Sequence, residues 1–120
     1  MARGRASSYT SQRETILAQA AVLFARHGYS GTSMNQVAAA CGISKPALYH
    51  YVRDKQQLVA TIAQEHVARL EAVVRDVLRL PLEPEPRLRE LIMRFMAEYA
   101  GAQDAHRVLT EDVRYLDTEA

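Results

Sequence analysis

The stretch Thr32–Lys55, TSMNQVAAACGISKPALYHYVRDK, decides the fold of this chain of 120 residues. It predicts two short helices joined by a glycine turn, and the second of them is basic and aromatic. Because helices this short bury little apolar surface of their own, the unit is suited to present one helix to a partner. A helix that carries Lys45, Tyr49, His50 and Tyr51 fits the major groove of DNA.

Local capping signals define where these two helices begin. Ser33 and Gln36 match a capping box, which predicts a helix from Met34 to the glycine of the turn. Ser44 caps the next helix, and Pro46 lies in its first turn, where the missing N–H costs nothing. Both helices are therefore specified by residues close to them in the sequence.

Longer helices are predicted on both sides. The spacing of apolar residues predicts one helix over about 12–27, and Gly28 is placed to end it in a left-handed conformation. A second capping box, Asp54 with Gln57, starts a helix that continues to about Arg79.

The rest of the sequence is also helical in pattern. The prolines of PLEPEP, residues 81–86, predict a rigid link, followed by one helix over about 85–100 and another from 103 or 104 onward. We find no alternation typical of a β-strand and no internal repeat. The chain is therefore predicted to be all-α.

The composition excludes several classes of protein. Apolar residues make up 48% of the chain and charged residues 24%, as in ordinary globular domains. The single cysteine, Cys41, excludes an internal disulfide and a multi-cysteine zinc site. No apolar run is long enough for a membrane span, and the N-terminus lacks the apolar segment of a signal peptide. These features predict a cytoplasmic protein without a membrane partner.

Charge divides the chain into two unlike halves. Residues 1–55 carry seven basic and two acidic side chains, a net charge of +5, whereas residues 56–120 carry eight arginines and twelve acidic side chains, a net charge of −4. Because phosphate attraction is local and screened within about 8–10 Å, the asymmetry matters more than the overall charge of +1. The front half is the part that could bind DNA.

No catalytic arrangement is found. The four histidines show no metal-ligand spacing, and Cys41 lies on the inward face of its helix, so no metal, cofactor or enzyme activity is predicted. Gly-rich phosphate loops and nucleophile elbows are absent from the sequence. His66 lies on an apolar stripe, where it is either a core histidine or a ligand contact.

Residues 28–58, GYSGTSMNQVAAACGISKPALYHYVRDKQQL, resemble the DNA-binding domain of the tetracycline-repressor (TetR) family of bacterial transcription regulators, and the match covers about residues 10–60. Several features fall at the spacing of the family. They are the glycine after the first helix, the Thr32–Ser33 pair, the turn over 40–44, the LYHY segment over 48–51, and Lys55 ahead of Leu58.

The resemblance implies a helix-turn-helix over about 32–51 whose third helix enters the major groove, in a dimer on near-palindromic double-stranded operator DNA. The positions that it assigns to DNA binding are Thr32, Ser33, Ser44, Lys45, Pro46, Ala47, Tyr49, His50, Tyr51 and Lys55. Thr32, Ser33 and Lys55 would bind phosphate. A cation in the first turn of a helix opposes the helix dipole, so Lys55 is better explained by a phosphate than by stability.

Individual side chains leave alternatives open. Lys45 is the residue most expected to contact a base edge, since lysine can donate to guanine O6 and N7. Tyr49 either contacts DNA through its hydroxyl or packs against the first helix, and His50 either contacts a base or is solvated. Arg3 and Arg5 form a solvated tail or enter the minor groove.

The resemblance also implies a division into three parts. Residues 1–9 would be a flexible basic arm, residues 10–56 the DNA-binding domain, and residues 57–120 an incomplete helical domain for ligand binding and dimerisation. A small apolar or amphipathic effector of unknown identity would release a repressor from DNA. Its candidate contacts are Ile62, His66, Phe95, Met96 and Tyr99.

The family's dimerisation helices have no counterpart in this sequence. We therefore expect a truncated regulator, with a short variant that associates differently as the alternative. A homodimer is expected for a full-length form and is doubtful for these 120 residues. A helical protein-interaction module with little DNA binding of its own is the alternative function.

Overall fold

The computed structural model describes residues 2–116, with side chains from Ser8 onward, and these residues contain no β-strand. The helices are α1 (Ala2–His27), α2 (Met34–Cys41), α3 (Lys45–Leu48), α4 (Lys55–Leu78), α5 (Pro84–Gly101) and α6 (Gln103–Arg107), followed by a π-helical turn (Val108–Asp112) and a 3-10 turn (Val113–Tyr115). The prediction of an all-α fold is confirmed. Within the described part, no helix combines the length and the apolar character needed to cross a membrane.

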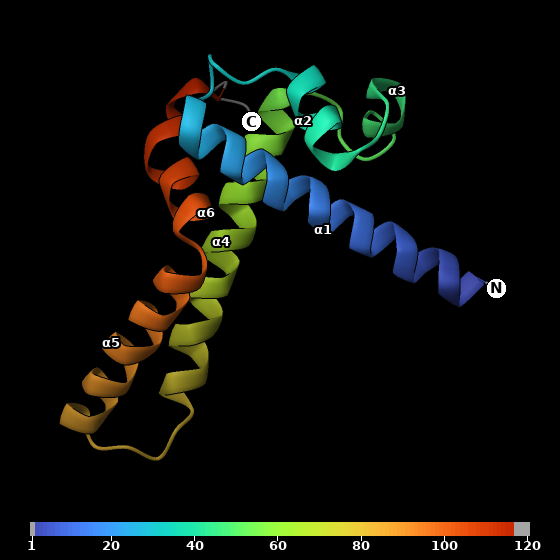
Figure 1. The fold of residues 1–120 in the computed structure, drawn as a ribbon. Coiled ribbons are helices and arrows are strands. Elements are labelled where there is room, and N and C mark those ends of the chain that lie inside the picture. The colour runs from blue at the N-terminus through green and yellow to red at the C-terminus, as the bar shows by residue number, and fades with distance from the viewer. Residues whose placement is uncertain (1, 117–120) are drawn as a thin grey trace.

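The helices form a head and an arm (Figure 1). The head contains most of α1 together with α2 and α3, which lie to one side of α1. The arm begins at Lys55 with α4, and α5 runs back along α4. The chain then returns through α6 to contact α1, so both ends of the arm's path meet the head.

The core of the head lies where its helices meet the start of α4. Phe24, Val37, Leu48 and Leu58 come from α1, α2, α3 and α4 respectively, and each is at most 1% exposed. Removing such side chains from water contributes about 1.5–3 kcal/mol each. The short helix α3 is therefore held mainly by Leu48, its one buried residue.

Most of the predicted helix boundaries are confirmed. Ser33 and Gln36 form the complete capping box of α2, and Gly28 and Gly42 have φ values of 74° and 68° after α1 and α2. The box of α4 differs in one bond. The Asp54 side chain accepts from the Gln57 N–H as predicted, but the Gln57 side chain accepts from Arg53 N.

Two predicted boundaries are wrong. The first helix begins at Ala2, so an irregular arm over 1–9 is not observed in the backbone. Residues 2–11 contain no proline and include alanine and arginine, which propagate a helix that is already started. The third helix, expected over about 45–51, ends at Leu48, and the next residues continue as tighter turns, with His50 N–H donating to the Ala47 carbonyl and Tyr51 N–H to the Leu48 carbonyl. The side chains of Arg3 and Arg5 lie outside the described part.

His66 lies in the core of the arm, which agrees with the first of its two predicted roles, a core histidine rather than a ligand contact. It is fully buried, and its Nε2 lies 3.3 Å from Nδ1 of His106 on α6. Its Nδ1 atom is also buried and has no hydrogen-bond partner. Burial and then the positive charge of Arg69 lower the pKa of His66, so the neutral ring is the stable form in the folded protein.

This lowered pKa predicts a loss of stability in mild acid. Below the ordinary histidine pKa of about 6.5, the unfolded chain binds a proton that folded His66 does not, so the free energy of unfolding falls as the pH falls, by at most about 1.4 kcal/mol per pH unit. Chemical denaturation between pH 8 and pH 5.5 measures the slope. His66→Leu should flatten it, whereas His50→Gln, at an exposed position, should not. Equal slopes for the parent and His66→Leu would contradict this role.

Candidate DNA-binding surface

The exposed face of α3 is set by its one buried anchor. Because Leu48 points into the core, the residues around it lie on the outer surface, and Lys45, Pro46, Tyr49 and His50 are all exposed. Ala47 is partly buried. α3 and the turn that follows it therefore present a cation, an imidazole and a phenol, which are groups that contact base edges and phosphates in DNA.

Two serines lie at the helix starts beside this face. Ser44 Oγ accepts from the Ala47 N–H at 3.2 Å, and Ser33 Oγ accepts from the Gln36 N–H at 3.1 Å. Accepting a bond leaves each hydroxyl proton free to donate outward, and both residues are exposed. Both serines thus combine a helix cap with a donor suited to a phosphate oxygen.

The side chain of Thr32 is directed into the molecule. Its side chain is 2% exposed, and its hydroxyl proton is shared between the carbonyl oxygens of Gly28 at 2.8 Å and Leu23 at 3.2 Å. The hydroxyl therefore satisfies the end of α1. It cannot reach a phosphate without breaking these bonds.

Lys55 is also used inside the molecule. Its Nζ donates to the carbonyl oxygens of Tyr29 at 2.8 Å and Thr32 at 3.0 Å, and it lies 4.1 Å from the centre of the Tyr29 ring. These contacts account for the cation within the chain, without a phosphate. The partners of Lys55 are the carbonyls and the ring of the link between α1 and α2.

The tyrosines around α3 divide into two roles. Tyr49 is 44% exposed and available to a partner, whereas the ring of Tyr51 stacks on Tyr9 of α1 with the ring centres 4.8 Å apart. Packing against the first helix, which was considered for Tyr49, is thus the role of Tyr51. Tyr9 was not predicted to take part, because it falls in the segment expected to be irregular.

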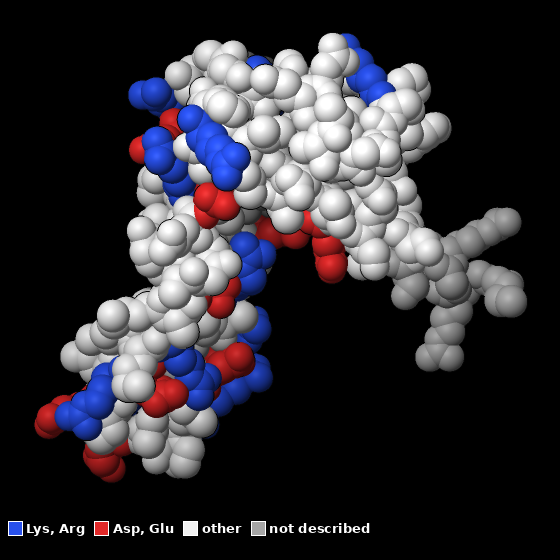
Figure 2. Space-filling model, in the orientation of Figure 1, with Lys and Arg blue, Asp and Glu red and all other residues white. Residues whose placement is uncertain are grey.

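Ion pairing reduces the positive field of the head. Arg13 binds Glu65 at 2.7 Å and Arg53 lies 3.4 Å from Asp54, while Lys55 is held by carbonyls. On the face shown in Figure 2, charged side chains of both signs gather along the arm and where it meets the head, and blue atoms also lie over the region of α3. Lys45 is the cation that α3 itself presents.

One junction residue was missed by the sequence analysis. Tyr29, in the link after α1, donates its backbone N–H to the carboxylate of Asp112, and its ring stacks on Tyr115 with the centres 4.9 Å apart. No local pattern signals these contacts, because the partners are more than eighty residues apart along the chain. Asp112 is 4% exposed, and burial raises the pKa of its carboxyl group.

The five candidate ligand contacts do not form one site. Ile62 lines a cavity between α1, α4 and α6, whereas His66 lies in the core against His106. Phe95 is partly buried on α5, but Met96 and Tyr99 are 66% and 51% exposed. The rings of Tyr99 and His106 form a T-shaped contact, with ring centres 5.2 Å apart.

The sequence is similar to those of known transcription regulators. The sequence model for bacterial regulatory proteins of the tetR family matches residues 16–62. The chain is 29% identical over 110 residues to the HTH-type transcriptional activator FasR of Mycolicibacterium smegmatis, covering 92% of this chain and 50% of that protein. It is 37% identical over 67 residues to the HTH-type transcriptional repressor AcnR of Corynebacterium glutamicum, covering 56% of this chain and 36% of that protein.

Solved structures agree. A TetR-family transcriptional regulator from Bordetella parapertussis superposes with a TM-score of 0.84 at 36% identity, over 89% of this chain and 56% of that one. The ketosteroid regulator KstR2 of Mycobacterium tuberculosis superposes with a TM-score of 0.72 at 29% identity, over 81% of this chain and 49% of that one.

The arrangement of α2 and α3, together with these similarities, defines a helix-turn-helix protein. The chain belongs to the TetR family of bacterial transcription regulators. It spans about half the length of the curated relatives that it matches over most of its own length.

The internal role of Thr32 predicts a stability effect without a binding effect. Thr32→Val keeps the shape of the side chain but removes the buried hydroxyl bonds to the carbonyls of Leu23 and Gly28, so it should lower the free energy of unfolding by about 1–3 kcal/mol. Urea denaturation measures the loss. Ser30→Ala, at an exposed position in the same link, should change it little.

The DNA affinity of Thr32→Val, measured where the variant is fully folded, should equal that of the parent protein. A lower DNA affinity of the fully folded variant would instead support a contact between Thr32 and a phosphate.

Proposed function

We propose that this chain is the DNA-binding part of a bacterial transcription regulator, which inserts the exposed face of α3 into the major groove. The observation that supports this most directly is the position of Leu48, whose burial fixes Lys45, Tyr49 and His50 on the outer surface. In this proposal Lys45 donates to a base edge, with Pro46 and Ala47 against the groove wall. Ser33 and Ser44 donate to phosphates on either side.

The wider activity is proposed for the whole regulator. Two heads would bind a near-palindromic operator as a homodimer, and a small apolar or amphipathic effector would release a repressor in the bacterial cytoplasm. The chain's relatives include both an activator and repressors by name. The proposed movement of α4 is supported by Lys55, which connects the first turn of α4 to the link between α1 and α2.

A second function is favoured by one feature of the arm. The outer face of α5 carries exposed apolar side chains in the described structure: Leu88, Ile92, Met93, Met96 and Tyr99. Such a stripe is suited to a protein partner. The two functions differ in salt dependence, because DNA binding through several phosphates weakens steeply with salt and apolar association does not.

Lys45→Ala tests the main proposal. DNA selected by the chain from a random pool should show a preferred base at one position per site, and the variant should lose about 1–3 kcal/mol of discrimination there. Fluorescence anisotropy at several salt concentrations measures affinity for the selected duplex and for single-base variants of it. Arg79→Ala is the matched control, because it also removes one positive charge, at an exposed position at the far end of α4.

The proposal fails if Lys45→Ala and the parent bind every duplex alike. It also fails if no duplex is enriched from the pool. Apolar association of the chain that is insensitive to salt would then favour the interaction module.

A further inference from the structure

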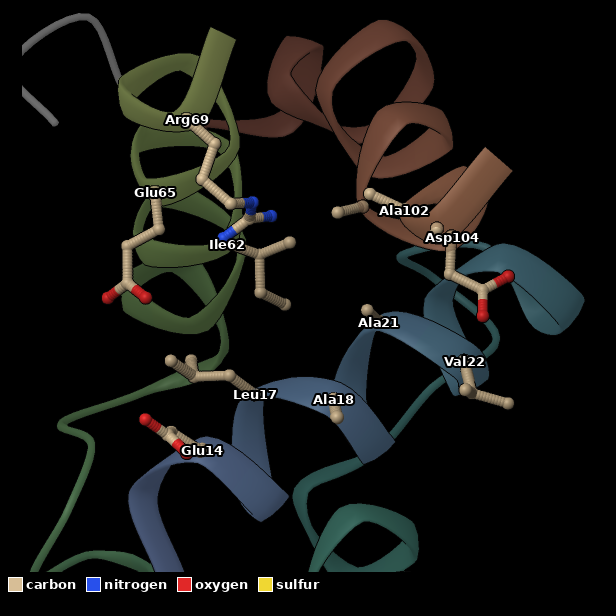
Figure 3. A pocket seen from close by; sticks show the side chains of 12 residues that line it. Glu14, Leu17, Ala18, Ala21, Val22, Ile62, Glu65, Arg69, Ala102 and Asp104 are labelled. Atoms are coloured by element: carbon tan, nitrogen blue, oxygen red, sulfur yellow. The ribbon is translucent and has the colours of Figure 1, made fainter. Parts of the chain in front are cut away.

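A cavity of about 420 Å³ lies at the junction of the head and the arm. Figure 3 shows its lining, in which Leu17, Ala18 and Ala21 come from α1, Ile62 from α4 and Ala102 from the start of α6. The volume is in the range of small-molecule sites, about 300–1,000 Å³. None of the contacts expected from the sequence except Ile62 lies here.

Small side chains leave this space open. Alanines face it from two sides, namely Ala18 and Ala21 on α1 and Ala102 and Ala105 on the α6 side, so the helices meet without filling the volume between them. Leu17, Val22 and Ile62 complete an apolar floor. An apolar group would therefore find contacts from three helices.

The rim of the cavity is unevenly charged. Its lining includes three carboxylates and one guanidinium. Glu65 is paired with Arg13 at 2.7 Å, and Arg69 is paired with Glu98 at 3.1 Å.

The two other carboxylates, Glu14 and Asp104, are exposed and have no ion-pair partner among the described residues. In Figure 3 they lie at opposite ends of the apolar lining. A ligand on the floor would thus lie between two uncompensated negative charges.

We infer that this cavity is a binding site for an amphipathic organic cation, with its apolar body on the alanine-rich floor and its charge toward Glu14 and Asp104. An anion of the same shape would meet the same floor but the opposite electrostatics. An occupant would contact α1 of the head together with α4 and α6. Any effect of the occupant on operator binding rests on the proposed function, whereas the binding itself does not.

Tetraphenylphosphonium and tetraphenylborate test the inference, because they match in shape and differ in the sign of charge. Isothermal titration calorimetry of the chain without DNA should show saturable binding of the cation at one site, and binding of the anion weaker by about tenfold or more. The double variant Glu14→Gln/Asp104→Asn should lower the affinity for the cation by about tenfold. Glu83→Gln, an exposed carboxylate at the far end of the arm, should leave it unchanged.

Filling the cavity gives an independent test. Ala18 is exposed and lines the cavity, so Ala18→Leu should fold normally and block the probe. Ala97→Leu, at an exposed position on α5, is the matched control, and thermal melts check that each variant is folded.

The inference is overturned by no saturable binding at about millimolar probe, by equal binding of cation and anion, or by unchanged binding in both cavity variants. Because DNA is absent from the titration, these results do not depend on whether the chain binds an operator.

Discussion

The bonds between the Lys55 ammonium and the carbonyls of Tyr29 and Thr32 hold the head to the arm. A cation at the start of a helix is opposed by the helix dipole, so α4 gains nothing from it alone. The same cation satisfies carbonyl oxygens in a link that has no regular structure to pair them. The position of α4 relative to α2 and α3 follows from this contact, and Thr32 reinforces it by connecting the link to the last turns of α1.

The link between α1 and α2 also receives the end of the arm. Asp112 accepts the Tyr29 N–H, and Tyr115 stacks on the same residue whose ring lies beside Lys55. The beginning and the end of the arm therefore converge on one residue of the head. Since packed contacts of this kind move in discrete steps, a shift of α4 along α1 has to change the bonds at Tyr29.

The sequence predicted the parts of this fold that depend on near neighbours. Ser33, Gln36 and Ser44 act on N–H groups at most three residues away, so the starts of α2 and α3 could be assigned directly. Lys55 and Thr32 were assigned to phosphate alone because the carbonyls that they contact lie 23 and 26 residues from Lys55 and 4 and 9 residues from Thr32, in positions that only the folded link defines. The cavity between α1, α4 and α6 was likewise invisible, because its small residues come from three separate helices.

The pairing of charges in the head bears on how such a surface would bind DNA. The net charge of +5 on residues 1–55 suggested a strong phosphate field, but Arg13, Arg53 and Lys55 are engaged within the chain. Each phosphate contact that is lost weakens both affinity and its salt dependence. A head that offers chiefly Lys45, two serine hydroxyls and a tyrosine depends more on hydrogen-bond geometry than on charge. Such a head gains most from a second copy on the same duplex, because linking two weak sites multiplies their affinity without any new contact.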